Sequence, residues 1–205
     1  MHLCTCLLAA ILFGPALSLP LDRRTSGSGT ISHITSIATT MNRAIDRASK
    51  SITTDLTQML DDPWLDASTL TSTVNSNLNT MADATTMAAS GVAFALTSAA
   101  STISQAYVPN LDASISMLLS ATSNIVDVVH RTEHSALVDS KAEASNVQTQ
   151  VAIIRNGLLQ AKSELMNYAG TANVVASDGS RSSLMGADQT LVALFQNWDA
   201  TLAEF

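Results

Sequence analysis

The chain has 205 residues, of which 46% are hydrophobic and 13% charged, and its formal net charge is -7. This much apolar content with so few charges excludes a disordered chain, and the acidic balance excludes a nucleic-acid-binding protein, because such proteins bind by neutralising phosphates. Serine and threonine make up about a quarter of the residues, so we expect a polar surface made mainly of hydroxyl groups on one globular domain.

The first segment predicts an exported protein. Residues 3–13 form an uncharged apolar run, and small residues follow at Ala16 and Ser18, a pattern typical of a signal peptide over residues 1–18. The run is shorter than the ~18–20 residues that a membrane span requires. We therefore expect a secreted protein without a membrane span.

The residues after this leader predict a processed linker. Over residues 19–30 the basic pair ending at Arg24 precedes a Gly/Ser-rich stretch, which is typical of a flexible linker or of a short propeptide cleaved after Arg24. Both cysteines, Cys4 and Cys6, lie in the leader. The domain, residues 31–205, is therefore expected to fold without disulfides.

Helical periodicity dominates the first half of the domain. Apolar residues recur every three or four positions from Ile31 to Met59, which predicts a long helix, and Asp62-Pro63 should end it. A second helix should begin after Asp66 and break or kink at Ser90-Gly91. A third should run from Val92 to Tyr107 and end at Pro109-Asn110.

The second half repeats the pattern. We expect a fourth helix over residues 111–129, a fifth over 135–169 with heptad-like spacing, a loop over 170–183 and an aromatic-rich last helix over 184–205. No stretch alternates with period two for long enough to require a strand. Amphipathic helices joined by short breaks can bury their apolar faces only against one another, which predicts an all-α, up-and-down bundle of five to six helices.

One short motif suggests metal chemistry. His130, Glu133 and His134 match the H-x-x-E-H pattern in which two histidines one turn apart bind zinc and the glutamate handles a proton. A third ligand has no recognisable motif, and the simpler interpretation is a solvated helix end whose cationic residues complement the helix dipole. A zinc-dependent hydrolase is thus the alternative function.

Other catalytic and metal patterns are missing from the sequence. Asp61, Asp62 and Asp66 lack the spacing and glycine of a calcium loop, so they are interpreted as turn and capping residues. The chain contains no nucleophile elbow, phosphate loop or dinucleotide fingerprint. We expect no enzymatic activity and no cofactor.

The apolar interior is the remaining candidate site. Alanine- and methionine-rich helices can leave an apolar tunnel suited to a small lipid, or can separate so that an oil or air interface replaces a partner helix. Six large apolar residues are the candidate ligand contacts: Phe94, Tyr107, Met117, Leu158, Phe195 and Trp198.

The leader, the dibasic linker and the cysteine-free Ser/Thr/Ala-rich helices together resemble the fungal hydrophobic surface binding protein A family, also called the cell-wall galactomannoprotein family. The resemblance lies in residues 31–60, 70–82 and 137–169, and it is one of pattern and composition. The segment from His130 to His134 and the aromatic helix after residue 184 depart from it. The resemblance implies a secreted or wall-associated protein that adsorbs to hydrophobic surfaces or holds fatty acids, and it transfers no binding residue.

The sequence therefore predicts a secreted, non-enzymatic protein that binds a hydrophobic surface or a lipid, with cell-wall polysaccharide as a further candidate partner. A secreted effector that binds a host protein through its acidic faces is a third hypothesis.

Overall fold

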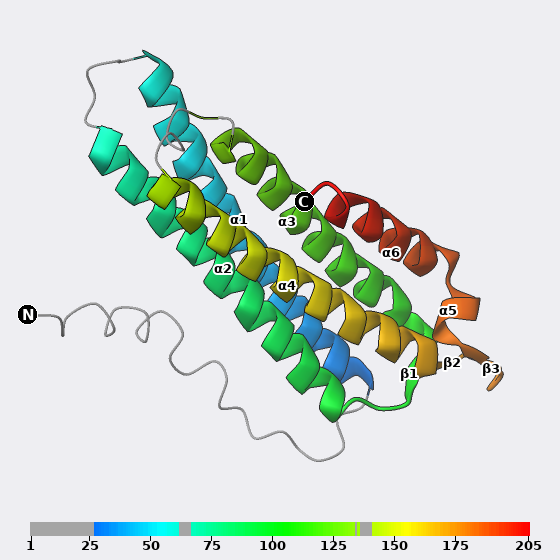
Figure 1. Ribbon diagram of the computed structural model, residues 1–205. Coiled ribbons are helices and arrows are strands. Elements are labelled where there is room, and N and C mark those ends of the chain that lie inside the picture. Colours follow the sequence, from blue (N-terminus) through cyan, green and yellow to red (C-terminus); the bar gives the residue numbers. More distant parts are fainter. Residues whose placement is uncertain (1–26, 62–66, 134, 136–140) are drawn as a thin grey trace, which may run out of the picture.

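The computed structural model describes residues 27–61, 67–133, 135 and 141–205 (Figure 1). The expected leader, the dibasic site at Arg24 and the turn at Pro63 lie outside these ranges. The described chain folds into an all-α bundle with a small sheet at one end, which confirms the predicted fold class. Four long helices run up and down: α1 (Gly27–Asp61), α2 (Ala67–Thr97), α3 (Val108–Glu133) and α4 (Lys141–Thr171).

The apolar stripe of α1 is the buried stripe. Its members at three- and four-residue spacing are all 3% exposed or less: Ile31, Ile34, Ala38, Met41, Ile45, Ala48 and Ile52. The helix begins at Gly27, four residues before the expected start. The end of the predicted linker is therefore helical.

The predicted break at Ser90-Gly91 is wrong, because α2 continues through both residues to Thr97. A Cβ at position 91 would lie 3.1 Å from Ile37 Cδ1 of α1. Glycine inside a helix costs about 1 kcal/mol relative to alanine. Here it allows α1 and α2 to approach closely, and the burial of Ala88 and Val92 on either side keeps the helix intact.

The predicted third helix over residues 92–107 is also wrong. After Thr97 the chain enters a short strand, β1 (Thr102–Ser104), and a 3₁₀ turn, η1 (Gln105–Tyr107). Helix α3 then begins at Val108, so Pro109 lies in its first turn. Proline is well suited to that position, because the first N–H groups of a helix have no intrahelical acceptor.

The segment from Gly170 to Ser183, expected to be a loop, contains two strands, β2 (Asn173–Val175) and β3 (Arg181–Ser183). The three-stranded sheet has the order β1-β2-β3, with β1 parallel to β2 and β2 antiparallel to β3. In the turn between β2 and β3, Gly179 has φ of +81°, and the Asp178 carboxylate accepts the backbone N–H of Ser180 at 2.9 Å. The expectation that no strand forms was wrong because three-residue strands are too short to show an alternating pattern.

The last predicted helix is divided at Asp188 into α5 (Leu184–Ala187) and α6 (Gln189–Leu202). Asp188 is the N-cap of α6, and its Oδ1 accepts the N–H groups of Thr190 at 2.9 Å and Leu191 at 3.4 Å. Four large side chains of α6 are buried: Leu191, Phe195, Trp198 and Leu202.

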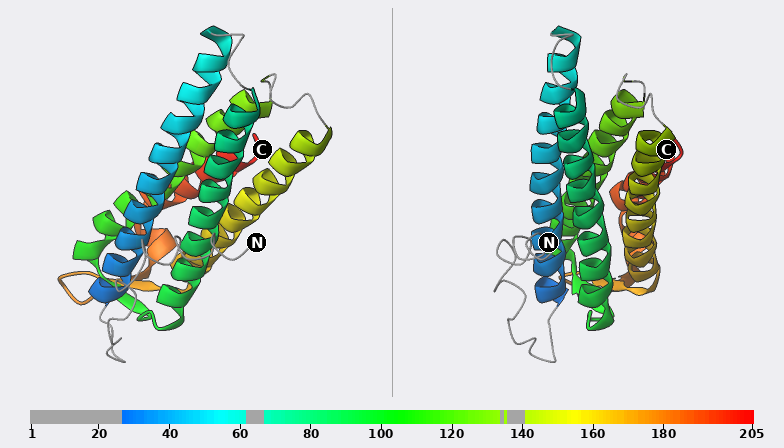
Figure 2. Two further views of the ribbon diagram at one scale, coloured as in Figure 1. Left: turned by 90° about the vertical axis from the view of Figure 1, so that its left-hand side faces the viewer. Right: turned by 60° about the vertical axis from the view of Figure 1, so that its left-hand side comes forward.

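The helices do not pack as a closed ring of four. Helix α1 packs on α2 and α3, and α2 packs on α4, whereas α3 and α4 contact each other only sparsely. Helix α6 lies alongside α3 and also contacts α4 (Figures 1 and 2). We call the line between α3 and α4 that α6 covers the α3–α4 seam.

Candidate functional site

The structure buries three of the six candidate ligand contacts in the core. Leu158 on α4 and Phe195 and Trp198 on α6 belong to one core cluster and are at most 2% exposed. Met117 on α3 is partly buried next to α1, where the Thr39 hydroxyl donates to its sulfur at 3.8 Å. The candidate site therefore centres on the side of the bundle that α6 covers.

The other two candidates lie on the outside. Phe94 on α2 is 55% exposed and Tyr107 in η1 is 37% exposed. Neither joins the cluster around Phe195. Phe94 lies on the back of α2, opposite the stripe that faces the bundle, and the expected third helix that would have turned Tyr107 inward does not exist.

A partly buried ion pair joins α4 to α6 next to Trp198. The Lys162 ammonium donates to the Asp199 carboxylate. Lys162 is 8% exposed, but the side chain of Asp199 is 62% exposed, so solvent screens one end of the pair. Because Lys162 lies one turn after Leu158, the ion pair also places Leu158 near the residues of α6 that face the seam.

Trp198 carries an unusual polar group for this core. Its side chain is fully buried, and its indole N–H has no hydrogen-bond acceptor. Leaving a buried donor unpaired costs about 1–3 kcal/mol. The aromatic cluster under α6 is thus apolar but not optimised for stability alone.

A pair of carboxyl groups lies at the other end of α6. Asp112, in the first turns of α3, and Asp188, the N-cap of α6, are within side-chain hydrogen-bonding reach. Burial, the hydrogen bond to Asp188 and the charge of Asp188 raise the pKa of Asp112 to about 7. Sequence analysis missed this pair. Asp188 carries a capping signal, an aspartate two residues before Thr190, but nothing in the sequence links it to Asp112.

A hollow of about 420 Å³ lies at the sheet, lined by residues 102–106 and 175–177. It is open to solvent, and its walls carry hydroxyl, amide and small apolar groups but no acid, base or histidine. None of the six candidate contacts lines it. This hollow therefore offers neither catalytic groups nor the predicted apolar contacts.

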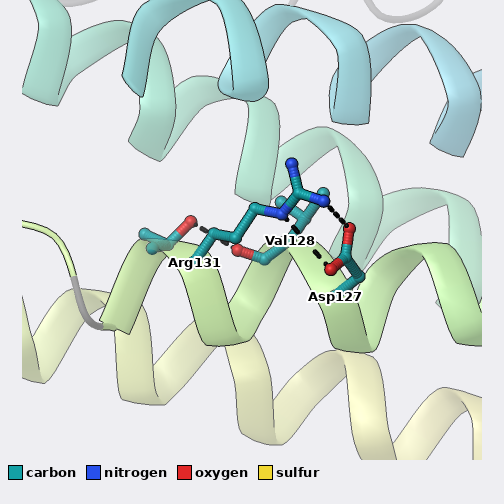
Figure 3. A network of polar contacts seen from close by, with 4 residues as sticks. Asp127, Val128 and Arg131 are labelled. Carbon is teal, nitrogen blue, oxygen red and sulfur yellow. Dashed lines mark hydrogen bonds and ion pairs between the residues drawn. The ribbon is translucent and has the colours of Figure 1, made fainter. Parts of the chain in front are cut away.

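The H-x-x-E-H segment lies at the end of α3, where His130 and Glu133 are exposed; His134 lies outside the described residues. Its neighbours make local helix contacts. Arg131 turns back to the Asp127 carboxylate, with N–O distances of 3.2 and 2.7 Å, and the buried Thr132 hydroxyl donates to the Val128 carbonyl at 2.8 Å (Figure 3). The ion pair follows the i, i+4 spacing of an exposed helix surface.

The described ranges contain no group of three His, Cys, Asp or Glu side chains placed to hold a metal ion. Asp62 and Asp66 of the acidic turn lie outside those ranges, and so does the side chain of Asp61. Over the same ranges, no helix combines the length and hydrophobicity needed to cross a membrane.

No protein-family model matches the chain, and no similar curated protein or solved structure was found. The geometry of the seam is therefore the basis for a functional proposal.

Proposed function

We propose that this chain is a secreted, non-enzymatic binding protein for apolar material, a hydrophobic surface or a fatty-acyl chain, and that α6 is the element that gives way to it. The observation that carries the proposal is the position of α6. Its buried face covers a seam between α3 and α4, two helices that contact each other only sparsely.

The energetics favour exchange at this place. Burying a large apolar side chain stabilises a fold by about 1.5–3 kcal/mol, and α6 buries Leu191, Phe195, Trp198 and Leu202. An acyl chain or a hydrophobic surface that covers the same side chains keeps them out of water, and so supplies a similar stabilisation. Displacement of α6 onto such a surface therefore costs little free energy, because its apolar side chains stay covered. Displacement of α6 into water loses the whole free energy of their burial.

The attachment of α6 to the bundle contains no covalent bridge, because the sequence has no cysteine after Cys6. The ion pair between Lys162 and Asp199 is exposed at its acidic end. The unpaired indole N–H of Trp198 is a hydrogen-bond donor, and a carboxyl oxygen of a fatty acid is a suitable acceptor for it. These features support a helix that can be displaced.

Localisation outside the cell, with attachment to wall polysaccharide, is part of the same proposal. It rests on the signal-peptide pattern of residues 1–18 and on the family resemblance. The hydroxyl-rich, solvent-exposed faces of the helices suit a protein that stays dissolved until it binds apolar material or wall polysaccharide.

The test fixes α6 in place. In a chain with Cys4 and Cys6 replaced by serine, Lys162→Cys/Asp199→Cys is joined by a flexible bis-maleimide, and the same variant without cross-linker is the matched control. We measure adsorption to an octyl resin and uptake of a fluorescent fatty acid. The uncross-linked variant should adsorb and bind like the wild type, and the cross-linked form should lose both.

Two results contradict the proposal at different levels. If cross-linked and uncross-linked proteins behave alike, α6 is not the element that moves. If the wild type neither adsorbs nor takes up the fatty acid, and mass spectrometry finds no lipid in extracts of the native protein, apolar binding itself is wrong.

A further inference from the structure

Asp112 and Asp188 face each other across the start of the α3–α6 contact. Asp112 Oδ1 and Asp188 Oδ2 are both buried, and no N–H or hydroxyl group donates to either of them. Two carboxylate oxygens are both acceptors, so a hydrogen bond between them requires a proton on one. A hydrogen bond between Asp112 and Asp188 where α6 meets α3 therefore needs one shared proton.

The position of the proton follows from the helix cap. Asp188 Oδ1 already accepts the backbone N–H groups of Thr190 and Leu191, and such donors favour a carboxylate. Asp112 consequently donates and Asp188 accepts. Asp188 cannot swing away from Asp112 without giving up the cap of α6, so the pair couples protonation to the docking of this helix.

Other charged groups do not account for the environment of Asp112. Near this end, α1 carries His33 and β3 carries Arg181. On α4, Lys162 pairs with Asp199 at the other end of α6, and Glu164 lies two residues after Lys162. Helix α6 itself carries Asp199, which is engaged with Lys162. Burial, the hydrogen bond with Asp188 and the charge of Asp188 raise the pKa of Asp112.

We propose that Asp112 and Asp188 form a one-proton latch that fastens α6 to α3 in acid and loosens as the pH rises towards neutral. The latch concerns the docking of α6 itself. The latch rests on the proposed function only in its consequence: at neutral pH, release of α6 exposes Phe195 and Trp198 to an apolar ligand more easily.

The direction follows from linkage. With α6 docked, the pKa of Asp112 is about 7, and with α6 released it returns towards the ordinary value of 3.8. The docked state then holds one proton more than the released state between these two values. The equilibrium constant for release rises by up to about tenfold per pH unit in this window and levels off above it.

The experiment is native-state hydrogen exchange of the full chain without any ligand, from pH 4 to 8.5, corrected for the intrinsic rate. In the wild type the protection of the amides in residues 189–202 should fall with rising pH relative to the amides of α2. In Asp112→Asn the amide can donate to Asp188 at every pH, so this protection should not change with pH. Asp127→Asn, an exposed aspartate on the same helix, should retain the wild-type response.

The latch is wrong if protection of α6 does not change with pH in the wild type, or if Asp112→Asn follows the same slope. Carboxyl-carbon NMR of the wild type gives an independent reading that holds even if the variant does not fold. A titration midpoint of Asp112 near 7 is expected, and a midpoint near 4 overturns the proposal. Since no apolar ligand is present, these outcomes are separate from the success or failure of the binding tests.

Discussion

Gly157 on α4 lies directly against Thr85 on α2, and a Cβ at position 157 would come within 3.1 Å of the Thr85 carbonyl carbon and 3.2 Å of its carbonyl oxygen. The third near atom is the Thr85 Cβ at 3.2 Å, and none of these three atoms can rotate away from the helix backbone. The contact between α2 and α4 therefore depends on the missing side chain at this position.

Gly157→Ala should destabilise the protein although alanine favours a helix. Overpacking against a backbone costs about 1–3 kcal/mol, which exceeds the roughly 1 kcal/mol gained in helix propensity. We expect the midpoint of thermal unfolding to fall by a few degrees. Gly170→Ala is the matched control, because a Cβ there meets nothing within 4 Å and the change should leave stability equal or higher. If both variants lowered the unfolding midpoint by the same amount, the close contact between Gly157 and Thr85 would be contradicted.

Phe195→Ala and Phe94→Ala should differ sharply. Phe195 is 2% exposed and Phe94 55% exposed. Removing the buried ring should cost about 3–5 kcal/mol, whereas removing the exposed ring should change stability by less than about 0.5 kcal/mol. Urea unfolding of both variants measures the difference. Equal losses would show that Phe94 also packs into a core.

The ion pair between Lys162 and Asp199 should respond asymmetrically. Asp199→Asn leaves the buried Lys162 ammonium without its carboxylate, which we expect to cost about 1–2 kcal/mol after allowance for the exposed partner. Lys162→Met leaves only an exposed aspartate, and its apolar side chain suits the buried site, so its cost should be smaller. Chemical unfolding of the two variants and of the double variant gives the coupling energy. A larger loss in Lys162→Met than in Asp199→Asn would contradict the burial of the ammonium.

Global stability should fall as the pH rises from about 4 to 7. The pKa of Asp112 is raised to about 7 in the folded state, so the folded chain binds an extra proton above pH 4, and the stabilisation is lost as that proton leaves. Because Asp112 is only partly buried, we expect a loss of about 1–2 kcal/mol rather than the full linkage value. Denaturant unfolding at pH 4.5, 6 and 8 measures it. Asp112→Asn should flatten the profile, and an unchanged profile in that variant would assign the pH dependence to other groups.

The sequence was informative where one periodic stripe faced one partner. The stripe from Ile31 to Ile52 predicted α1, and the clear spacing around Leu158 predicted α4. Prediction failed where a long-range contact decided the local structure. Gly91 reads as a break in the sequence because its packing against Ile37 is not visible there. The pattern predicts a helix at Ile103 because its strand partner, Val174, lies 71 residues later.

The candidate site followed the same rule. Phe195 and Trp198 were found because they share one helical stripe, and they are buried together in the structure. Phe94 is a candidate only because of its aromatic ring, and Tyr107 because of a predicted helix that does not form; both are on the surface. Asp112 and Asp188 were missed because their chemistry arises from a meeting between two helices that are distant in the sequence.

The position of α6 after the other helices in the sequence has a consequence for biosynthesis. Helices α1 to α4 leave the ribosome first, and β2 can pair with β1 only after a long stretch of chain has been made. The helix that covers the seam is synthesised after all of them. A nascent chain therefore presents an uncovered apolar strip until residues 189–202 have been made, and this strip is where a chaperone would engage it.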